Sequence, residues 1–170
     1  MQDTQYDFSS TQVNLPEDLS QEIIEWGKKN VTDKDLYVKD SKYGREDEPH
    51  VTILYGIHSA EYKETASLIK GYGEAKIKLG KMSVFTNDKY DVLIIEVMSK
   101  DLEKLRKTLT DKVEYSSDHP KYQPHVTIAY VKKGRGWKFY GNEWFTNQQF
   151  KTNHITFSSY TNDKHRLSLA

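Results

Sequence analysis

The chain contains no cysteine among its 170 residues. This absence excludes disulfide bonds, zinc sites with thiolate ligands and a thiol nucleophile. Proteins of reducing compartments commonly lack disulfides, so we expect this protein to be cytoplasmic. Any enzymatic activity must therefore use other side chains.

The chain also lacks an excess of charge of either sign. Its 25 lysine and arginine residues balance 25 aspartate and glutamate residues, so the formal net charge at pH 7 is zero. Proteins that hold a long nucleic acid by its backbone usually carry a basic excess. The balance therefore favours a small partner, or the end of a longer molecule.

Long apolar runs are missing too. The longest, Val92 to Val97, is interrupted by Glu96 and is far shorter than the roughly 20 residues of a membrane-spanning helix. The first residues have neither a basic start nor an apolar stretch, so we expect no secretory signal and no membrane partner. A chain of this length fits one domain with its own core, and we expect residues 1–170 to form a single domain.

The apolar pattern predicts a mixture of strands and helices. Strand patterns occur at 5–13, 50–57, 76–85, 90–98, 125–131, 150–160 and 166–169. Helical patterns begin at Pro16 and recur at 61–69 and 102–109. Without a strict alternation of strand and helix, this order favours an α+β fold with antiparallel sheets.

One segment occurs twice. Residues 49–55 read PHVTILY and residues 124–130 read PHVTIAY, and a Lys-Tyr pair precedes each copy by a few residues. The segments that follow the two copies differ, so the repeat indicates two related lobes and not a solenoid. A third His-x-Thr, at 154–156, lacks the shared flanking residues and is interpreted as part of an ordinary strand.

Strand geometry explains why this spacing is useful. Side chains at positions i and i+2 share a face and lie about 6.5–7 Å apart along the strand. We therefore expect His50 and Thr52 to point one way, and His125 and Thr127 likewise in the second copy. The Val, Ile and Tyr residues of each copy are expected on the opposite face, toward the core.

Two imidazoles and two hydroxyls suit the chemistry of a phosphodiester. With pKa values near 6.5, one histidine can accept a proton while the other donates one. Threonine hydroxyls can donate hydrogen bonds to the phosphate oxygens, where charge gathers in the transition state. Zinc is the alternative, but it usually needs three protein ligands and each copy offers one histidine. We expect no metal and no other cofactor.

Paired His-x-Thr strands in a chain of this size resemble the 2H phosphoesterase superfamily, which includes the LigT-like RNA cyclic phosphodiesterases. The resemblance covers nearly the whole chain, including the separation of the two motifs and the final segment FSSYTNDKHRLSL. It implies an α+β fold of two pseudo-symmetric lobes of antiparallel sheet, with flanking helices, around a central cleft. It also implies a catalytic set of His50, Thr52, His125 and Thr127.

A narrower resemblance rests on the opening YDFSSTQVNLP followed by a helix. This opening is similar to that of phage-encoded members, among them the anti-CBASS nucleases, which destroy the cyclic oligonucleotide signals of bacterial antiviral defence. The resemblance implies cleavage of a 3′–5′ linkage in a cyclic di- or trinucleotide, ending in a linear 3′-phosphate product. A phage-encoded enzyme would act in the host cytoplasm. The sequence leaves open which histidine is the base.

Candidate substrate contacts lie in two kinds of segment. Residues 131–145 interleave basic and aromatic side chains, as nucleotide sites do, although a surface loop with its rings tucked into the core is the alternative. The candidates there are Lys132, Lys133, Trp137 and Trp144. Further candidates, for stacking or as lids, are Tyr6, Tyr43 and Tyr122. The acidic run at 46–48 would repel phosphate and is expected to be a solvated loop.

Two other functions stay open. An RNA-end enzyme would open 2′,3′-cyclic phosphates or act on 2′–5′ linkages, with short RNA as its partner. A binding module would sequester nucleotides without cutting them, although it would not need an acid–base pair. The balanced charge slightly favours a cyclic oligonucleotide, and no obligate protein partner is evident.

Overall fold

The structure, a computed structural model, describes residues 6–117, 119 and 121–170. Its eight strands are β1 (Ser9–Asn14), β2 (His50–Ile57), β3 (Ala75–Thr86), β4 (Tyr90–Met98), β5 (His125–Lys132), β6 (Gln149–Thr152), β7 (His154–Ser158) and β8 (Lys164–Ser168). The α-helices are α1 (Glu17–Asn30), α2 (Lys63–Ile69) and α3 (Lys100–Thr110), and two short 3₁₀ helices, η1 (Asp33–Asp35) and η2 (Trp137–Phe139), complete the fold.

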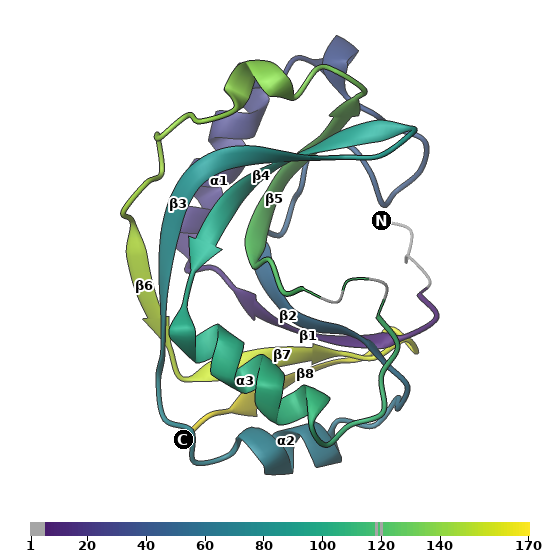
Figure 1. Cartoon of the computed structure of the whole chain (residues 1–170), viewed down its shortest axis with the longest axis vertical. Helices are drawn as coiled ribbons and strands as arrows, with labels where there is room; N and C mark the ends of the chain where they lie inside the picture. The colour runs from purple at the N-terminus through teal and green to yellow at the C-terminus, as the bar shows by residue number, and fades with distance from the viewer. Residues whose placement is uncertain (1–5, 118, 120) are drawn as a thin grey trace.

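All eight strands form one antiparallel sheet in the order β6-β3-β4-β5-β2-β1-β7-β8. The sheet curls so strongly that β6, at one edge, is followed after a single residue by β7, near the other edge. Figure 1 shows the two halves, β3 to β6 and the remaining strands, facing each other. The α+β fold with two antiparallel lobes is therefore confirmed.

The two halves meet at one pair of residues. Among the described residues, β2 and β5 pair at Val51 and Val126, both fully buried, and the two strands then diverge. Because the sheet splits here, the residues on either side of this pair lie at the junction of the lobes. His50, Thr52, His125 and Thr127 are those residues.

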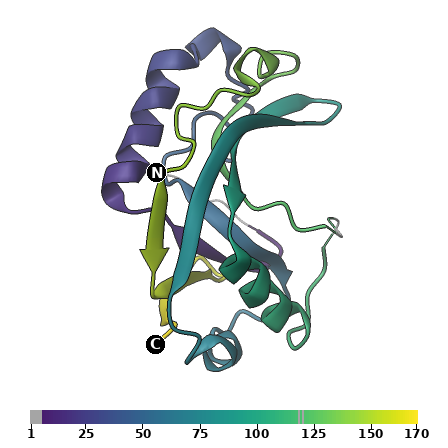
Figure 2. The same ribbon diagram turned by 60° about the vertical axis from the view of Figure 1, so that its left-hand side comes forward.

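Helices cover the outer faces of the curled sheet, as the two views in Figures 1 and 2 show. α1 packs against β5, and α3 packs against β2 and β3. Apolar side chains on one face of each helix are buried, among them Ile23 on α1 and Leu105 on α3. The side chain of Ser99 accepts a hydrogen bond from Leu102 N and caps α3, which stabilises such a helix by about 1 kcal/mol.

The predicted strand at 150–160 is wrong as a single element. It is divided at Asn153, with β6 pairing with β3 and β7 pairing with β1. The carbonyl of Asn153 instead accepts a hydrogen bond from Leu169 N. Local propensity favours strand throughout, but the chain must pass here from one lobe to the other. The predicted strand at 5–13 begins only at Ser9, so its start was wrong for residues 6–8, while residue 5 lies outside the described residues.

Candidate active site

The four motif side chains lie on one face of the two junction strands. His50 and Thr52 flank Val51 on β2, and the second copy repeats this arrangement on β5. Since Val51 and its partner are buried in the core, their neighbours at i−1 and i+1 point away from it. All four motif side chains are half-buried. The duplicated motif thus converges on one place.

Both motif histidines are held in the same tautomer. His50 Nδ1 lies 2.8 Å from Glu48 O, and His125 Nδ1 lies 2.8 Å from Gln123 O. A carbonyl oxygen only accepts, so each Nδ1 carries the hydrogen and donates it. Each Nε2 is left available to a substrate. Within the part of the chain that is described, no hydrogen-bond partner occupies either Nε2 or the hydroxyls of Thr52 and Thr127.

The two histidines differ in their surroundings. Burial lowers the pKa of His125, its bond to the Gln123 carbonyl opposes this, and the nearby charge of His50 lowers the pKa further. The ring of Phe85, on β3, packs edge-on against His125 with centroids 4.8 Å apart. His125 therefore favours the neutral form, which is the form that accepts a proton.

Two matched β-bulges change the faces of both strands. Ile53 is the extra residue of β2 against β1, and Ile128 is the extra residue of β5 against β4. A bulge inverts the alternation of the residues after it. Tyr55 and Tyr130, the last residues of the two copies, therefore turn to the same face as His and Thr. The expectation that these tyrosines point to the core was wrong.

A segment that precedes the second motif braces the first motif strand. Where β2 diverges from β5, its carbonyls need other partners. The hydroxyl of Tyr122 donates to Thr52 O at 2.7 Å, and Arg106 Nη1 donates to Ile53 O at 2.9 Å. Further along, Ser116 N donates to Gly56 O at 2.9 Å. The guanidinium of Arg106 also lies over the Tyr122 ring, 4.8 Å from its centroid.

The second motif strand is braced reciprocally. Beyond its junction with β2, β5 pairs with the segment that precedes the first motif: Glu46 N donates to Ile128 O at 2.9 Å, and Tyr130 N donates to Gly44 O at 2.8 Å. Each copy of the motif is therefore held by the loop that leads into the other copy. The sequence showed the two loops as similar but gave no sign of this exchange.

A hollow of the described structure lies beside the first motif. Its volume is about 530 Å³, and His50, Thr52, Tyr55 and Tyr130 are among its walls. Burial raises the pKa of the Glu46 carboxyl in this wall, and the nearby His50 opposes the increase. The expectation of a solvated acidic loop was therefore wrong for Glu46, which is half-buried, whereas Asp47 and Glu48 are exposed.

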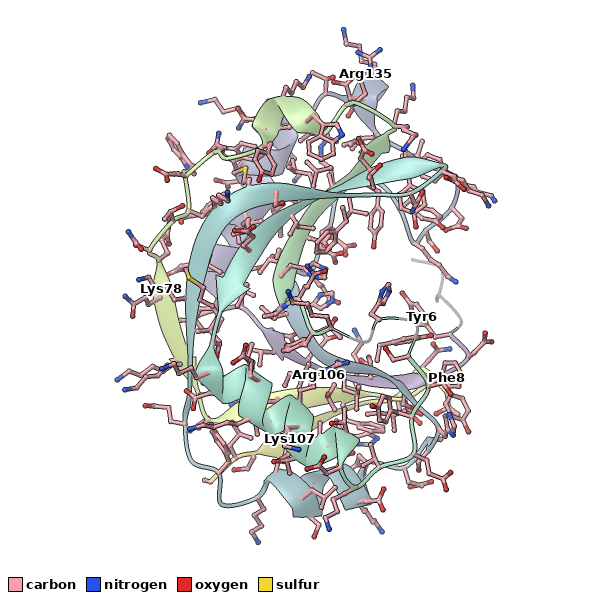
Figure 3. The ribbon with its side chains drawn as sticks, in the orientation of Figure 1. Tyr6, Phe8, Lys78, Arg106, Lys107 and Arg135 are labelled. Carbon is pink, nitrogen blue, oxygen red and sulfur yellow. The ribbon has the colours of Figure 1, made fainter. Side chains whose placement is uncertain are left out.

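Two predicted substrate contacts lie in the wall of this hollow. Tyr6 is half-exposed, with its ring edge-on to Tyr55 at 6.1 Å and below Lys42 Nζ at 5.1 Å. It points toward the space between the lobes (Figure 3). Tyr43 packs edge-on against Tyr130, with centroids 5.2 Å apart, so only part of its ring is available.

The other predicted contacts lie elsewhere. Tyr122 is half-buried beneath β2, where its hydroxyl is engaged as described above. Lys133 Nζ donates to Asn87 O at 2.6 Å in the β3–β4 turn. Trp137 and Trp144 are exposed by 49% and 71% in the loop around η2, and Lys132 is exposed at the end of β5. None of these five lines the hollow beside His50.

Residues that the sequence did not mark as catalytic or as substrate contacts complete the site. Phe85 contacts His125, Glu46 lies near His50, and Arg106 supports β2, the strand of His50. The tyrosines at the ends of the two copies carried a signal, since they are part of the repeat. Nothing local in the sequence marks Phe85 or Arg106, because each reaches the site from a distant element.

Within the described ranges, no group of three or more His, Cys, Asp or Glu side chains is placed to hold a metal ion. No helix of those ranges is long and apolar enough to cross a membrane.

The chain matches a known protein family. The sequence model of the family described as anti-CBASS protein Acb1 matches residues 11–146, which include both motif copies. No curated protein matches the chain at a significant level.

Solved structures share the fold. TT0787 of Thermus thermophilus has a TM-score of 0.67 at 12% identity, with 95% of this chain and 97% of that chain covered. E. coli LigT complexed with 3′-AMP has a TM-score of 0.57 at 17% identity, with 98% and 96% covered. LigT complexed with NADP+ has a TM-score of 0.55 at 18% identity, with 96% and 95% covered. The chain therefore shares the fold of LigT and TT0787.

Proposed function

Because the chain belongs to the family of anti-CBASS protein Acb1, we propose that it is a metal-independent phosphodiesterase that cleaves 3′–5′ linkages of cyclic di- and trinucleotides. Its products are linear and end in a 3′-phosphate, and their formation counteracts CBASS antiviral immunity. The observation that carries the proposal is the pair of His-x-Thr sets, with both Nε2 atoms available to a substrate at the lobe junction.

The reaction proceeds in two steps. His125, whose pKa burial lowers, removes the proton of a 2′-hydroxyl, and the 2′-oxygen attacks the adjacent phosphorus. The bond from phosphorus to the 5′-oxygen breaks, and His50 protonates that oxygen. Water then opens the resulting 2′,3′-cyclic phosphate: His50 takes a proton from water, and His125 returns one to the 2′-oxygen. Both histidines end in their starting states.

The hydroxyls of Thr52 and Thr127 stabilise the transition state. They lie on the same face as the histidines and donate to the two non-bridging oxygens, on which negative charge gathers. Tyr55, Tyr130 and Tyr6 provide aromatic surface for a base beside His50. The reaction needs no metal ion, since its charges are handled by imidazoles and hydroxyls.

An RNA-end phosphodiesterase is the second candidate, because the fold is shared with LigT, which was solved in complex with 3′-AMP. Both functions use the same two histidines. They differ in the substrate that the walls accept, so only a comparison of substrates separates them.

The deciding experiment is incubation with a panel of cyclic di- and trinucleotides in EDTA, with products resolved by chromatography and mass. We expect linear products that end in 3′-phosphate. RNA ending in a 2′,3′-cyclic phosphate is the parallel substrate. Turnover of that RNA alone would replace the proposed function by the second candidate, and recovery of every ligand intact would indicate a binding module.

The pH dependence of kcat/KM tests the role of His125. As the base it must be neutral, so activity falls as the pH drops through its pKa, which burial places below the ordinary value of about 6.5. We therefore expect the acidic limb of the profile below pH 6.5. An NMR titration of the free protein measures the same group directly. Phe85→Ala exposes His125 and should raise the pKa of its imidazole. An acidic limb at or above pH 6.5 in the wild-type profile would contradict the assignment of His125 as the base.

A further inference from the structure

A polar row extends from the first motif across four strands. Gln12 on β1 lies opposite Thr52 on β2 and opposite Thr156 on β7. Thr156 in turn lies opposite Arg166 on β8. Directly opposed residues of antiparallel strands share a face of the sheet. With strands about 4.8 Å apart, the row carries the active face about 14 Å from β2 to β8.

The far end of this row is a shallow hollow that we call the donor hollow. It measures about 360 Å³ and is lined by Asn153, His154, Arg166 and Ser168. Every one of these side chains can donate a hydrogen bond, and none is acidic. Within the described ranges, no carboxylate lies within ion-pair distance of Arg166. A cation without a carboxylate partner, surrounded by neutral hydrogen-bond donors, is typical of a site that binds an anion.

His154 is held as one of these donors. Arg166 Nη2 lies 3.1 Å from His154 Nδ1, closer than Asn153 Oδ1 at 3.3 Å and Thr152 Oγ1 at 3.4 Å. Because a guanidinium only donates, this shortest contact makes Nδ1 an acceptor. The remaining proton of the ring is then on Nε2, the reverse of the tautomer found in His50 and His125. Burial and the charge of Arg166 lower the pKa of His154, so the ring stays neutral. The third His-x-Thr therefore supplies a fixed N–H donor.

We propose that the donor hollow binds a phosphate of the substrate other than the one being cleaved, with Arg166 as the main contact. The inference rests on the proposed function, because only a substrate with several phosphodiesters can occupy both places at once. It makes Arg166 a residue that selects oligonucleotides with more than one phosphate.

The charges around the first motif give a reason for this arrangement. Glu46, Asp47 and Glu48 all border the hollow beside His50, so the wall there repels a substrate that carries several negative charges. Lys164, the nearest cation on β8, is already paired with Glu48 at 3.2 Å. Lys42, over the Tyr6 ring, also borders the hollow, in the same segment as the acidic run. Arg166 is the cation of β8 on this face that is left for phosphate.

The test compares substrates that differ in their number of phosphates. Cyclic triadenylate has three, the linear trinucleotide ApApA has two, and the dinucleotide ApA has one. We expect Arg166→Gln to raise the KM of cyclic triadenylate and of ApApA about tenfold, as the loss of one partly exposed charge-assisted contact does, with kcat within about twofold. ApA, as substrate or as competitive inhibitor, should be unaffected. Arg166→Lys should restore part of the loss.

Two controls make the result specific. Lys29→Gln removes an exposed cation on α1, on the outer side of the other lobe, and should change none of the three constants. The salt dependence of KM for cyclic triadenylate should weaken in Arg166→Gln, by about 0.7 in the slope of log KM against log salt concentration, as expected for one phosphate contact with a single strand.

The outcomes separate this inference from the proposed function. If the wild type cleaves cyclic triadenylate and Arg166→Gln leaves its KM unchanged, or affects ApA equally, the subsite is overturned and the function stands. If the wild type cleaves no cyclic oligonucleotide, the proposed function fails and the subsite fails with it. A loss confined to the substrates with two or more phosphates supports the proposal.

Discussion

Replacing His125 or His50 with alanine is expected to lower kcat by about 10²- to 10⁴-fold on cyclic oligonucleotides, since each removes a proton-transfer group. The two residues act in the same step, so the double variant should be little slower than either single variant. Steady-state kinetics with product analysis measures this. A single variant with near wild-type turnover would refute the roles assigned to the motif.

The two variants should differ on an activated substrate. A 3′-phosphodiester with a nitrophenolate leaving group needs no acid, because nitrophenolate leaves without a proton. On this substrate His50→Ala should recover most of its activity, whereas His125→Ala should stay slow because the 2′-hydroxyl still needs a base. The reverse pattern would exchange the two roles. His165→Ala, which removes a ring stacked on Tyr62 away from the motifs, is the matched control.

Folding controls belong to the same experiment. The rings of His50 and His125 are half-buried, and each hydrogen-bonds only through Nδ1, to the carbonyl two residues before it. Replacing either histidine should therefore shift the thermal midpoint of unfolding by only a few degrees. A variant that loses activity while it keeps its unfolding transition has lost chemistry and not structure. Partial rescue of His125→Ala by added imidazole would support the same conclusion.

The sequence was sufficient for the parts of the site that are local. The predicted bounds of the first motif strand, 50–57, and of the strand at 90–98 match the structure, because their apolar pattern is strong and continuous. The i, i+2 spacing correctly placed His50 and Thr52 on one face. The apolar pattern predicted the α+β class, and the family resemblance that these residues carry implied the two-lobed fold.

What the sequence could not give depends on register and on distant contacts. Ile53 and Ile128 sit in bulges that only the partner strands define, so the strict alternation placed Tyr55 and Tyr130 on the wrong face. Arg106 reaches Ile53 O from a helix 53 positions away. No local pattern encodes such a contact, because it exists only once the lobes have packed.

Gly56→Ala is expected to be the most destabilising small substitution near the site. Gly56 is the extra residue of a second bulge in β2, and its φ is 102°, a region that disfavours residues with a Cβ. An added Cβ would also overlap the carbonyl oxygen of Ser116, a backbone atom that cannot rotate away. Strain plus displacement of this brace should cost about 3 kcal/mol, or roughly 6–12 °C in the thermal midpoint for a chain of this size.

Gly73→Ala separates the effect of the Ser116 contact from the effect of the positive backbone φ. Gly73 has a similar φ of 107°, but nothing lies within 4 Å of a Cβ added there, so it should lose only the conformational part, about 1 kcal/mol. Thermal unfolding of the two variants and the wild type measures the difference. Equal losses would mean that Ser116 yields easily. A larger loss at Gly56, accompanied by lower kcat, would mean that the loop leading into the second motif holds the first motif strand in its active position.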